Sequence, residues 1–165
     1  FMGLVGSEMC IRDRINIIPE SEELGYVGKP KNINKEKILN FISNKQIPIV
    51  VPLGLGDDGR IYNINADVAA GSIAKEIDAR RLLLMTDVEG VLDENQKLIS
   101  EINLNKANEM LKNNIISGGM IPKINTCLDA ISNGVRGVVI VDGRKPHSIL
   151  FELFSDKGAG TLIRK

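Results

Sequence analysis

Cysteine is scarce in this sequence, with only Cys10 and Cys127 among 165 residues. So few cysteines give no disulfide framework, which predicts a reducing compartment, the cytoplasm. Charge of one sign is absent as well, because 21 basic and 21 acidic residues give a formal net charge of zero. A balanced charge gives no electrostatic case for nucleic acid or an anionic membrane as a partner. The sequence also lacks a transmembrane run, an internal repeat and a low-complexity tract.

Helical and strand patterns alternate along the chain, and 43% of its residues are hydrophobic, enough for a sizeable core. Strands are expected at 49–53, 82–85, 137–141 and 161–163. Helices are expected at 35–44, from Asp67 onward, through Ala107 and Met110, from about Pro122 onward and at 146–154. Such alternation predicts an α/β fold with three layers, in which helices cover both faces of a mainly parallel sheet.

Residues 62–71 combine alternating polar side chains with the start of a helix. If the strand persists, Asn63, Asn65 and Asp67 project to one side while the apolar residues between them face the other. Two amides and a carboxylate then share a surface where a strand passes into a helix, the usual place for ligands in open α/β sheets. The alternative is a polar turn in which Asn65 caps the helix.

The segment 116–123 places two glycines before a helix and a lysine near its start. Pro122 suits the first helical turn. The apolar residues at helical spacing form a predicted buried stripe of Ile121, Ile124, Leu128 and Ile131. Lys123 lies off that stripe, where the helix dipole disfavours a cation unless it meets an anion such as phosphate. Taken alone, a lysine in this position is more often a solvated surface residue than a ligand-binding one.

A short apolar run at 82–85 leads into an acidic loop, 87–93. The run predicts a strand buried on both faces. The loop leaves the carboxyl end of that strand, where nucleotides bind in doubly wound sheets, although acidic residues also form turns. Neither a Walker lysine motif nor a G-x-G-x-x-G fingerprint is present, so a nucleotide would be held in another way.

Together these segments resemble the C-terminal two-thirds of a member of the amino acid kinase family. The similarity begins at about residue 24 and runs in order through 52–54, 63–67, 86–92, 116–123, 141–144 and 158–161. Within the family, the chain is most similar to the members that act in arginine biosynthesis. Those enzymes transfer the γ-phosphoryl group of ATP, with Mg²⁺, to the side-chain carboxylate of N-acetyl-L-glutamate. The resemblance implies the same activity for the parent of this chain.

The resemblance also implies a role for each candidate residue. Lys123 would neutralise charge on the transferring phosphoryl group, and Asp67 would orient the lysines. Asn63 would contact the amino-acid substrate, with support from Asn65. The nucleotide would lie against two segments, Asp87, Val88, Glu89, Gly90, Val91 and Leu92, and Ile115, Ile116, Ser117, Gly118, Gly119 and Met120. No protein metal site is expected, because Mg²⁺ would be held mostly by phosphate oxygens and water.

Residues 1–14 do not match the family pattern, which leaves 15–165 as the nucleotide-binding part of the domain. The chain has no Lys-Gly-Gly-type opening, so the resemblance implies that an N-terminal lobe with a second lysine is missing. The fragment alone is expected to be inactive, and the full-length parent is expected to be a homo-oligomer.

Two alternatives stay open. One is another carboxylate kinase of the family, acting on aminoadipate or glutamate, and the other is a nucleotide-binding module without catalysis. The tail 146–161 resembles arginine-inhibited members, which makes arginine a candidate feedback inhibitor. Lys157, however, stands where those members more often have an acidic residue.

Overall fold

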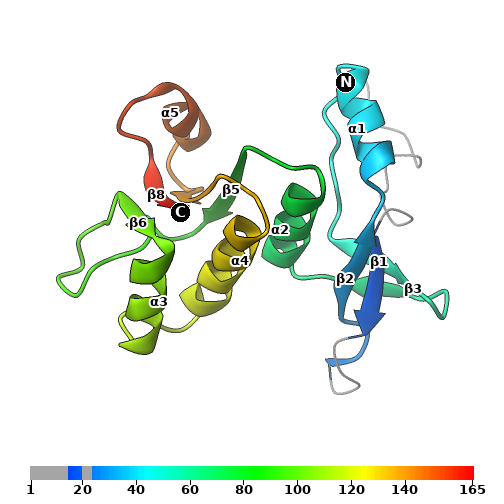
Figure 1. Cartoon of the computed structure of the whole chain (residues 1–165), viewed down its shortest axis with the longest axis horizontal. Coiled ribbons are helices and arrows are strands. Elements are labelled where there is room, and N and C mark those ends of the chain that lie inside the picture. The colour runs from blue at the N-terminus through cyan, green and yellow to red at the C-terminus, as the bar shows by residue number, and fades with distance from the viewer. Residues whose placement is uncertain (1–14, 20–23) are drawn as a thin grey trace. The chain divides into compact units, whose positions relative to one another are not determined.

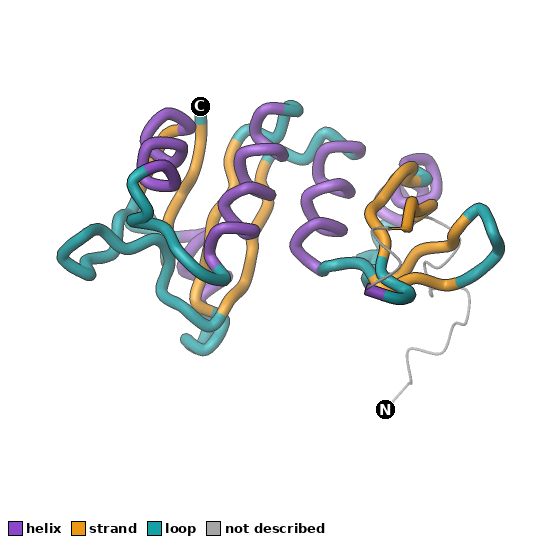
Figure 2. The backbone as a smooth tube through the Cα atoms, turned by 90° about the horizontal axis from the view of Figure 1, so that it is seen from below, coloured by secondary structure: helices purple, strands orange, loops and turns teal. Residues whose placement is uncertain are grey.

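The computed structural model describes residues 15–19 and 24–165, and the segment 1–14 lies outside the described residues (Figure 1). The chain divides into two compact units, with the boundary between Ile77 and Asp78. The alternation of helices and strands along both units can be followed in Figure 2. None of the helices in the described ranges combines the length and the apolarity needed to cross a bilayer.

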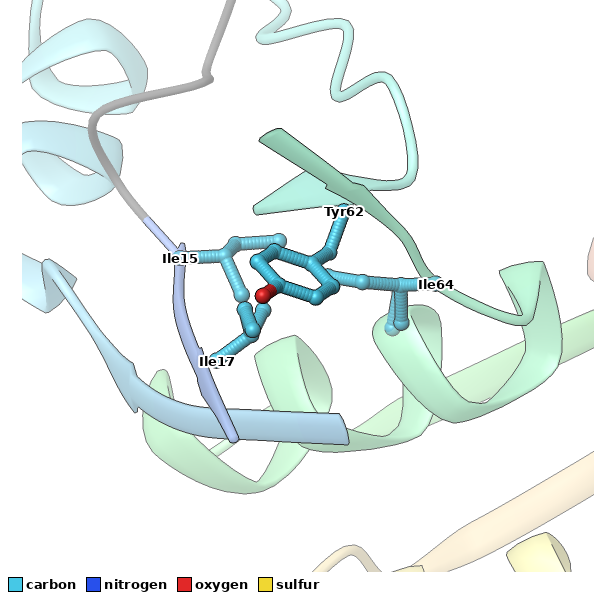
Figure 3. Packing of buried hydrophobic residues seen from close by; sticks show 5 residues of the cluster. Ile15, Ile17, Tyr62 and Ile64 are labelled. Carbon is cyan, nitrogen blue, oxygen red and sulfur yellow. The ribbon is translucent and has the colours of Figure 1, made fainter. Parts of the chain in front are cut away.

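The first unit is built on a four-stranded sheet. Its strands are β1 (Ile15–Pro19), β2 (Gly28–Ile33), β3 (Leu53–Gly56) and β4 (Ile61–Asn63), in the order β2-β1-β3-β4. The two helices of the unit are α1 (Lys35–Ser43) and α2 (Ala66–Glu76). The core is a cluster of Ile15, Ile17, Tyr62, Ile64 and Ala69, and Figure 3 shows the isoleucine side chains of β1 packed against the Tyr62 ring.

The second unit is built on another four-stranded sheet. Its strands are β5 (Arg81–Thr86), β6 (Glu101–Asn103), β7 (Gly137–Asp142) and β8 (Gly160–Arg164), in the order β5-β7-β8-β6. The helices are α3 (Leu104–Lys112), α4 (Met120–Ser132) and α5 (Ser148–Phe154). Every residue of β7 is buried. Because successive side chains of a strand point to opposite faces, both faces of this sheet are covered at β7.

Asparagine side chains cap the N-termini of α1, α2 and α3. The Oδ1 atoms of Asn34, Asn65 and Asn103 each accept a hydrogen bond from a backbone N–H of the first helical turn. These N–H groups have no partner within the helix, so a side-chain acceptor stabilises the helix start. Helix α4 differs, because its N-cap is Gly119 and no side chain caps it.

The predicted α/β class is confirmed, with strand directions more mixed than the alternation alone indicates. Three pairings between named strands are parallel, β1 with β3, β5 with β7, and β6 with β8. The other three are antiparallel. Strand direction depends on how distant segments connect, which local periodicity does not encode.

Some predicted details are wrong. The strand expected at 49–53 begins only at Leu53, where pairing with Asn63 starts, and Ile49 is 54% exposed. The run at 82–85 is not buried on both faces. It belongs to β5, an edge strand of its sheet, and Met85 is 46% exposed. The stripe of α4 turns away from Ile121, which is exposed, toward Cys127, which is fully buried.

Candidate functional site

Two adjoining pockets lie beside the loop that leaves the carboxyl end of β5. The first has a volume of about 200 Å³. Its lining comes from two segments, Val88, Gly90, Val91, Leu92, Asp93 and Gln96, and Ile115, Ile116, Ser117 and Met120. The pocket thus joins the two stretches that the sequence singled out for a nucleotide. Its walls are apolar at Val91, Leu92 and Ile116, as a flat aromatic base would require.

The second pocket has a volume of about 290 Å³ and contains the charged side chains of Asp87 and Lys123. It is lined by Thr86, Asp87, Val88, Ser117, Gly119, Met120 and Lys123. Val88, Ser117 and Met120 line both pockets, so the two hollows adjoin. The first has apolar side chains at Val91, Leu92 and Ile116, and the second includes Lys123 at the start of a helix.

The start of α4 offers backbone to a ligand at this charged end. Gly118 has a φ of +56°, a conformation that favours glycine, and a Cβ at Gly118 or Gly119 would meet no atom within 4 Å. Lys123 lies three residues after Met120, the first residue of α4, and is half-buried. A helix N-terminus carries partial positive charge, which Lys123 adds to. The arrangement favours an anion such as phosphate.

The wall formed by Gly90 and Val91 is held from behind by β8. Gly90 has a φ of +147°, and a Cβ there would lie 2.6 Å from the Thr161 Oγ1 atom. The Val91 N–H donates to that same oxygen at 2.8 Å. A side chain at position 90 has no space, so only glycine lets the loop approach the strand this closely.

A backbone hydrogen bond and an ion pair join this loop to the segment after β7. The Gly143 N–H donates to the Thr86 carbonyl at 2.7 Å, and Lys145 Nζ lies 2.7 Å from Glu89 Oε1. Buried Asp142 accepts from Arg144 Nε at 2.9 Å and from Nη2 at 3.0 Å. The guanidinium, a hydrogen-bond donor to the carboxylate, lowers the pKa of Asp142 to about 2.

The remaining candidates, Asn63, Asn65 and Asp67, lie in the first unit. Asn63 is exposed at the end of β4, next to buried Tyr62, so the predicted alternation is confirmed there. The strand ends at Asn63 and does not persist to Asp67. The capping alternative is confirmed for Asn65, whose Oδ1 accepts from the Asp67 N–H at 3.0 Å and the Val68 N–H at 3.2 Å. Half-buried Asp67 is the second residue of α2.

Sequence reasoning missed three lining residues, Thr86, Asp93 and Gln96. Asp93 Oδ1 accepts from the Asn95 and Lys97 N–H groups, both at 2.8 Å, and so forms the turn that carries Gln96 into the pocket. Leu92 and Leu98 bridge across this turn. The cluster of polar turn formers at 93–96 between two leucines was the available signal.

No group of three or more His, Cys, Asp and Glu side chains suitable for a metal ion occurs within the part of the chain that the structure describes. Of the acidic residues near the pockets, Asp87 and Glu89 are exposed, whereas Asp93 is half-buried and accepts hydrogen bonds within its own turn. These residues fit a Mg²⁺ ion that arrives with a polyphosphate and keeps most of its water, and they do not form a cage.

Curated proteins similar to this chain include acetylglutamate kinases. The chain is 58% identical over 151 residues to an acetylglutamate kinase of Pelagibacter ubique, covering 92% of this chain and 52% of that protein. It is 45% identical over 166 residues to an acetylglutamate kinase of Rhodospirillum rubrum, covering 98% of this chain and 53% of the relative. The chain spans about half the length of the curated relatives it matches.

Solved structures share the fold. A crystal structure of a Streptococcus mutans protein superposes with a TM-score of 0.79 at 33% identity, over 97% of this chain and 59% of the other. Carbamate kinase of Giardia lamblia bound to AMP-PNP superposes with a TM-score of 0.67 at 16% identity, over 92% and 59% of the two chains, and so shows the fold alone. The sequence profile of the amino acid kinase family matches residues 2–142. The chain belongs to the amino acid kinase family.

Proposed function

We propose that this chain is the nucleotide-binding part of a kinase that phosphorylates the side-chain carboxylate of N-acetyl-L-glutamate with ATP. One observation carries the proposal. Two adjoining pockets share Val88, Ser117 and Met120; one presents the apolar side chains Val91, Leu92 and Ile116, and the other holds Lys123 beside a helix start. That polarity matches a nucleotide, and the substrate is inferred from the relatives named acetylglutamate kinase.

In this proposal the base of ATP lies against Val91, Leu92 and Ile116. The phosphates then extend past Ser117 toward the glycine backbone before α4 and toward Lys123. The predicted nucleotide segments, 87–92 and 115–120, thus serve the two ends of one ligand. Mg²⁺ would arrive with ATP, held mostly by the phosphates and water, and would supply positive charge there.

The chemistry needs charge neutralisation more than acid–base catalysis. A glutamate side-chain carboxylate has an ordinary pKa of about 4.3 and is ionised at neutral pH, so it can attack phosphorus directly. The attacking anion must approach a polyanion, which makes fixed cations and N–H donors the main source of rate. Lys123 is the proposed cation of this chain, and Asp67 is proposed to orient it.

Asn63 is the proposed substrate contact, because its exposed side chain follows a buried strand position and precedes α2. Asn65 supports it through the cap that fixes the start of α2. In the complete kinase, we expect Asn63→Ala to weaken acetylglutamate binding while ADP affinity stays nearly unchanged. Calorimetry with each ligand checks this, and an equal loss of both affinities would place Asn63 outside the substrate site.

A test of the proposed function uses this chain as it stands. We expect weak Mg-ADP binding by calorimetry and negligible turnover in a coupled kinase assay, because about half of the relatives' length is not spanned here. Lack of measurable Mg-ADP binding would overturn the nucleotide assignment. Robust turnover by this chain alone would overturn the division of the site between this part and the rest.

A substrate panel on the complete kinase separates the alternatives. Preference for acetylglutamate supports the proposal, whereas preference for aminoadipate or glutamate assigns another carboxylate kinase, and nucleotide binding without turnover assigns a binding module. Arginine inhibition, homo-oligomerisation and a cytoplasmic location are proposed only for that complete protein. Arginine titration of the activity and sedimentation of the protein test the first two.

A further inference from the structure

Thr161 is a fully buried polar residue on β8 that the proposed function leaves without a role. Its hydroxyl donates a hydrogen bond to the Ile99 carbonyl at 2.6 Å and accepts one from the Val91 N–H at 2.8 Å. Both partners lie more than sixty residues away along the chain. A single side-chain oxygen thus satisfies two backbone groups of the loop that follows β5.

These two backbone groups are the ends of the turn that builds the apolar pocket. Val91 begins it, Leu92 and Leu98 bridge across it, and Ile99 ends it, with the Ile99 N–H donating to the Val91 carbonyl at 2.9 Å. The Thr161 hydroxyl therefore closes the base of the turn. Leu92, Asp93 and Gln96, which line the pocket, are carried on that base.

Gly90 supports the same contact from the other side of Val91. Its positive φ and its lack of a side chain let the loop lie directly against the Thr161 Oγ1 atom and the Leu98 side chain. The close approach at Gly90 and the hydrogen bonds at Val91 and Ile99 hold both ends of the turn on β8, so the loop has one preferred position there.

We propose that Thr161 is a positioning residue for the nucleotide pocket, whose hydroxyl sets the position of the wall formed by Gly90, Val91 and Leu92. The proposal rests on the proposed function in that the pocket must bind a nucleotide for the wall to matter. Thr161 does not touch the ligand and acts through the loop.

Valine has nearly the shape of threonine and the same preference for strands, so Thr161→Val removes the hydroxyl and retains the packing. The Val91 N–H and the Ile99 carbonyl then lose their side-chain partner, and a buried polar group without a partner is costly. Serine keeps the hydroxyl and loses only a methyl group. Thr126→Val, on α4 and away from both pocket linings, is the matched control for the substitution itself.

The experiment measures Mg-ADP affinity by calorimetry and amide hydrogen exchange of residues 88–92 in the whole chain. For Thr161→Val we expect affinity to fall about 5- to 20-fold and exchange in 88–92 to speed up, while Thr161→Ser and Thr126→Val stay within about 2-fold of the unsubstituted chain. If Thr161→Val does not fold, Thr161→Cys, with its weakly bonding thiol, is measured against the same expectations.

Unchanged affinity and exchange in the valine variant would overturn the proposal. So would equal losses in the valine and serine variants, because the methyl group would then be the important part. If the unsubstituted chain binds no Mg-ADP, the proposed function fails by itself. The exchange measurement then decides separately whether the hydroxyl fixes the loop.

Discussion

At the scale of single residues, Lys123 combines a charge with a place where charge has an effect. Its position near the start of α4 adds a cation to the positive end of a helix, which costs about 0.3–1 kcal/mol when the site is exposed. The same position would attract an anion entering the pocket that Lys123 shares with Asp87 and Gly119. In the proposed function, a small cost in stability thus accompanies an electrostatic effect on a phosphoryl group.

In the complete kinase, Lys123→Ala is expected to lower kcat about 100-fold and to change the KM for acetylglutamate little. The lysine matters most as negative charge shifts between oxygens, and the loss of one such donor costs about 3 kcal/mol in the transition state. Steady-state kinetics measure both constants, with Lys112→Ala on α3 as the control. An unchanged kcat would remove Lys123 from the mechanism.

The fork between Asp142 and Arg144 makes a prediction about acid stability. The pKa of Asp142 is about 2 in the folded chain and 3.8 ordinarily, so the pair stabilises the fold fully above about pH 4. This contribution declines as the pH falls from about 4 toward 2, where the folded chain also takes up the proton.

We therefore expect Arg144→Gln to be destabilised most at neutral pH, with the difference from the unsubstituted chain shrinking between pH 4 and pH 2. Urea unfolding at a series of pH values measures this difference. A constant difference across that range would show that the guanidinium does not govern the titration of Asp142. Lys145→Gln removes an ion pair between half-exposed side chains and the smallest of the effects that lower the pKa of Asp142, so it should have a smaller effect.

The residues also show what local sequence can and cannot predict about a site. The family resemblance assigns two segments to the nucleotide, and glycines, acidic residues and a strand end mark them in the sequence. The structure brings residues of both segments together around adjoining pockets. Thr161 was recognised only as part of a motif. Its partners Val91 and Ile99 are distant in sequence, so no local pattern reveals the contact.

At the scale of elements, the first residue of a helix can often be predicted from the sequence, because capping residues mark it. An asparagine before an apolar periodic run predicted α1 at Lys35, and the Asn34 side chain accepts from the Lys37 N–H at 3.0 Å. The last helix was expected at 146 and begins at Ser148, because His147 has a φ of +60° and cannot continue a right-handed helix. The ends of strands are harder to predict from the sequence, because a strand ends where its pairing with the neighbouring strand ends.

Asn65→Ala is expected to destabilise the first unit by about 1 kcal/mol, because the Asp67 and Val68 N–H groups lose their acceptor. Asn65→Asp retains an acceptor at the cap and should lose much less. Chemical unfolding followed by circular dichroism gives both values. Equal losses in the two variants would show that the cap does not hold α2.

At the scale of the whole molecule, the proposed site residues are divided between the two units. Asn63, Asn65 and Asp67 belong to the first unit, and Lys123 and both pockets belong to the second. Alternating helices and strands predicted the fold class, because each element must cover the apolar face of another. The mixed strand directions and the boundary at Ile77 depend on contacts between distant segments, which periodicity does not report.

The complete burial of Cys127 gives the chain a built-in reporter of its own opening. Its thiol lies on α4, one helical turn beyond Lys123, with no exposed surface. In a Cys10→Ser background, a thiol reagent can therefore modify Cys127 only when α4 leaves its place. We expect Mg-ADP to slow this modification in proportion to the bound fraction, because a ligand that binds the folded form alone reduces the open population. The rate of colour development with a chromogenic disulfide would then measure how firmly the nucleotide holds the helix that carries the proposed catalytic lysine.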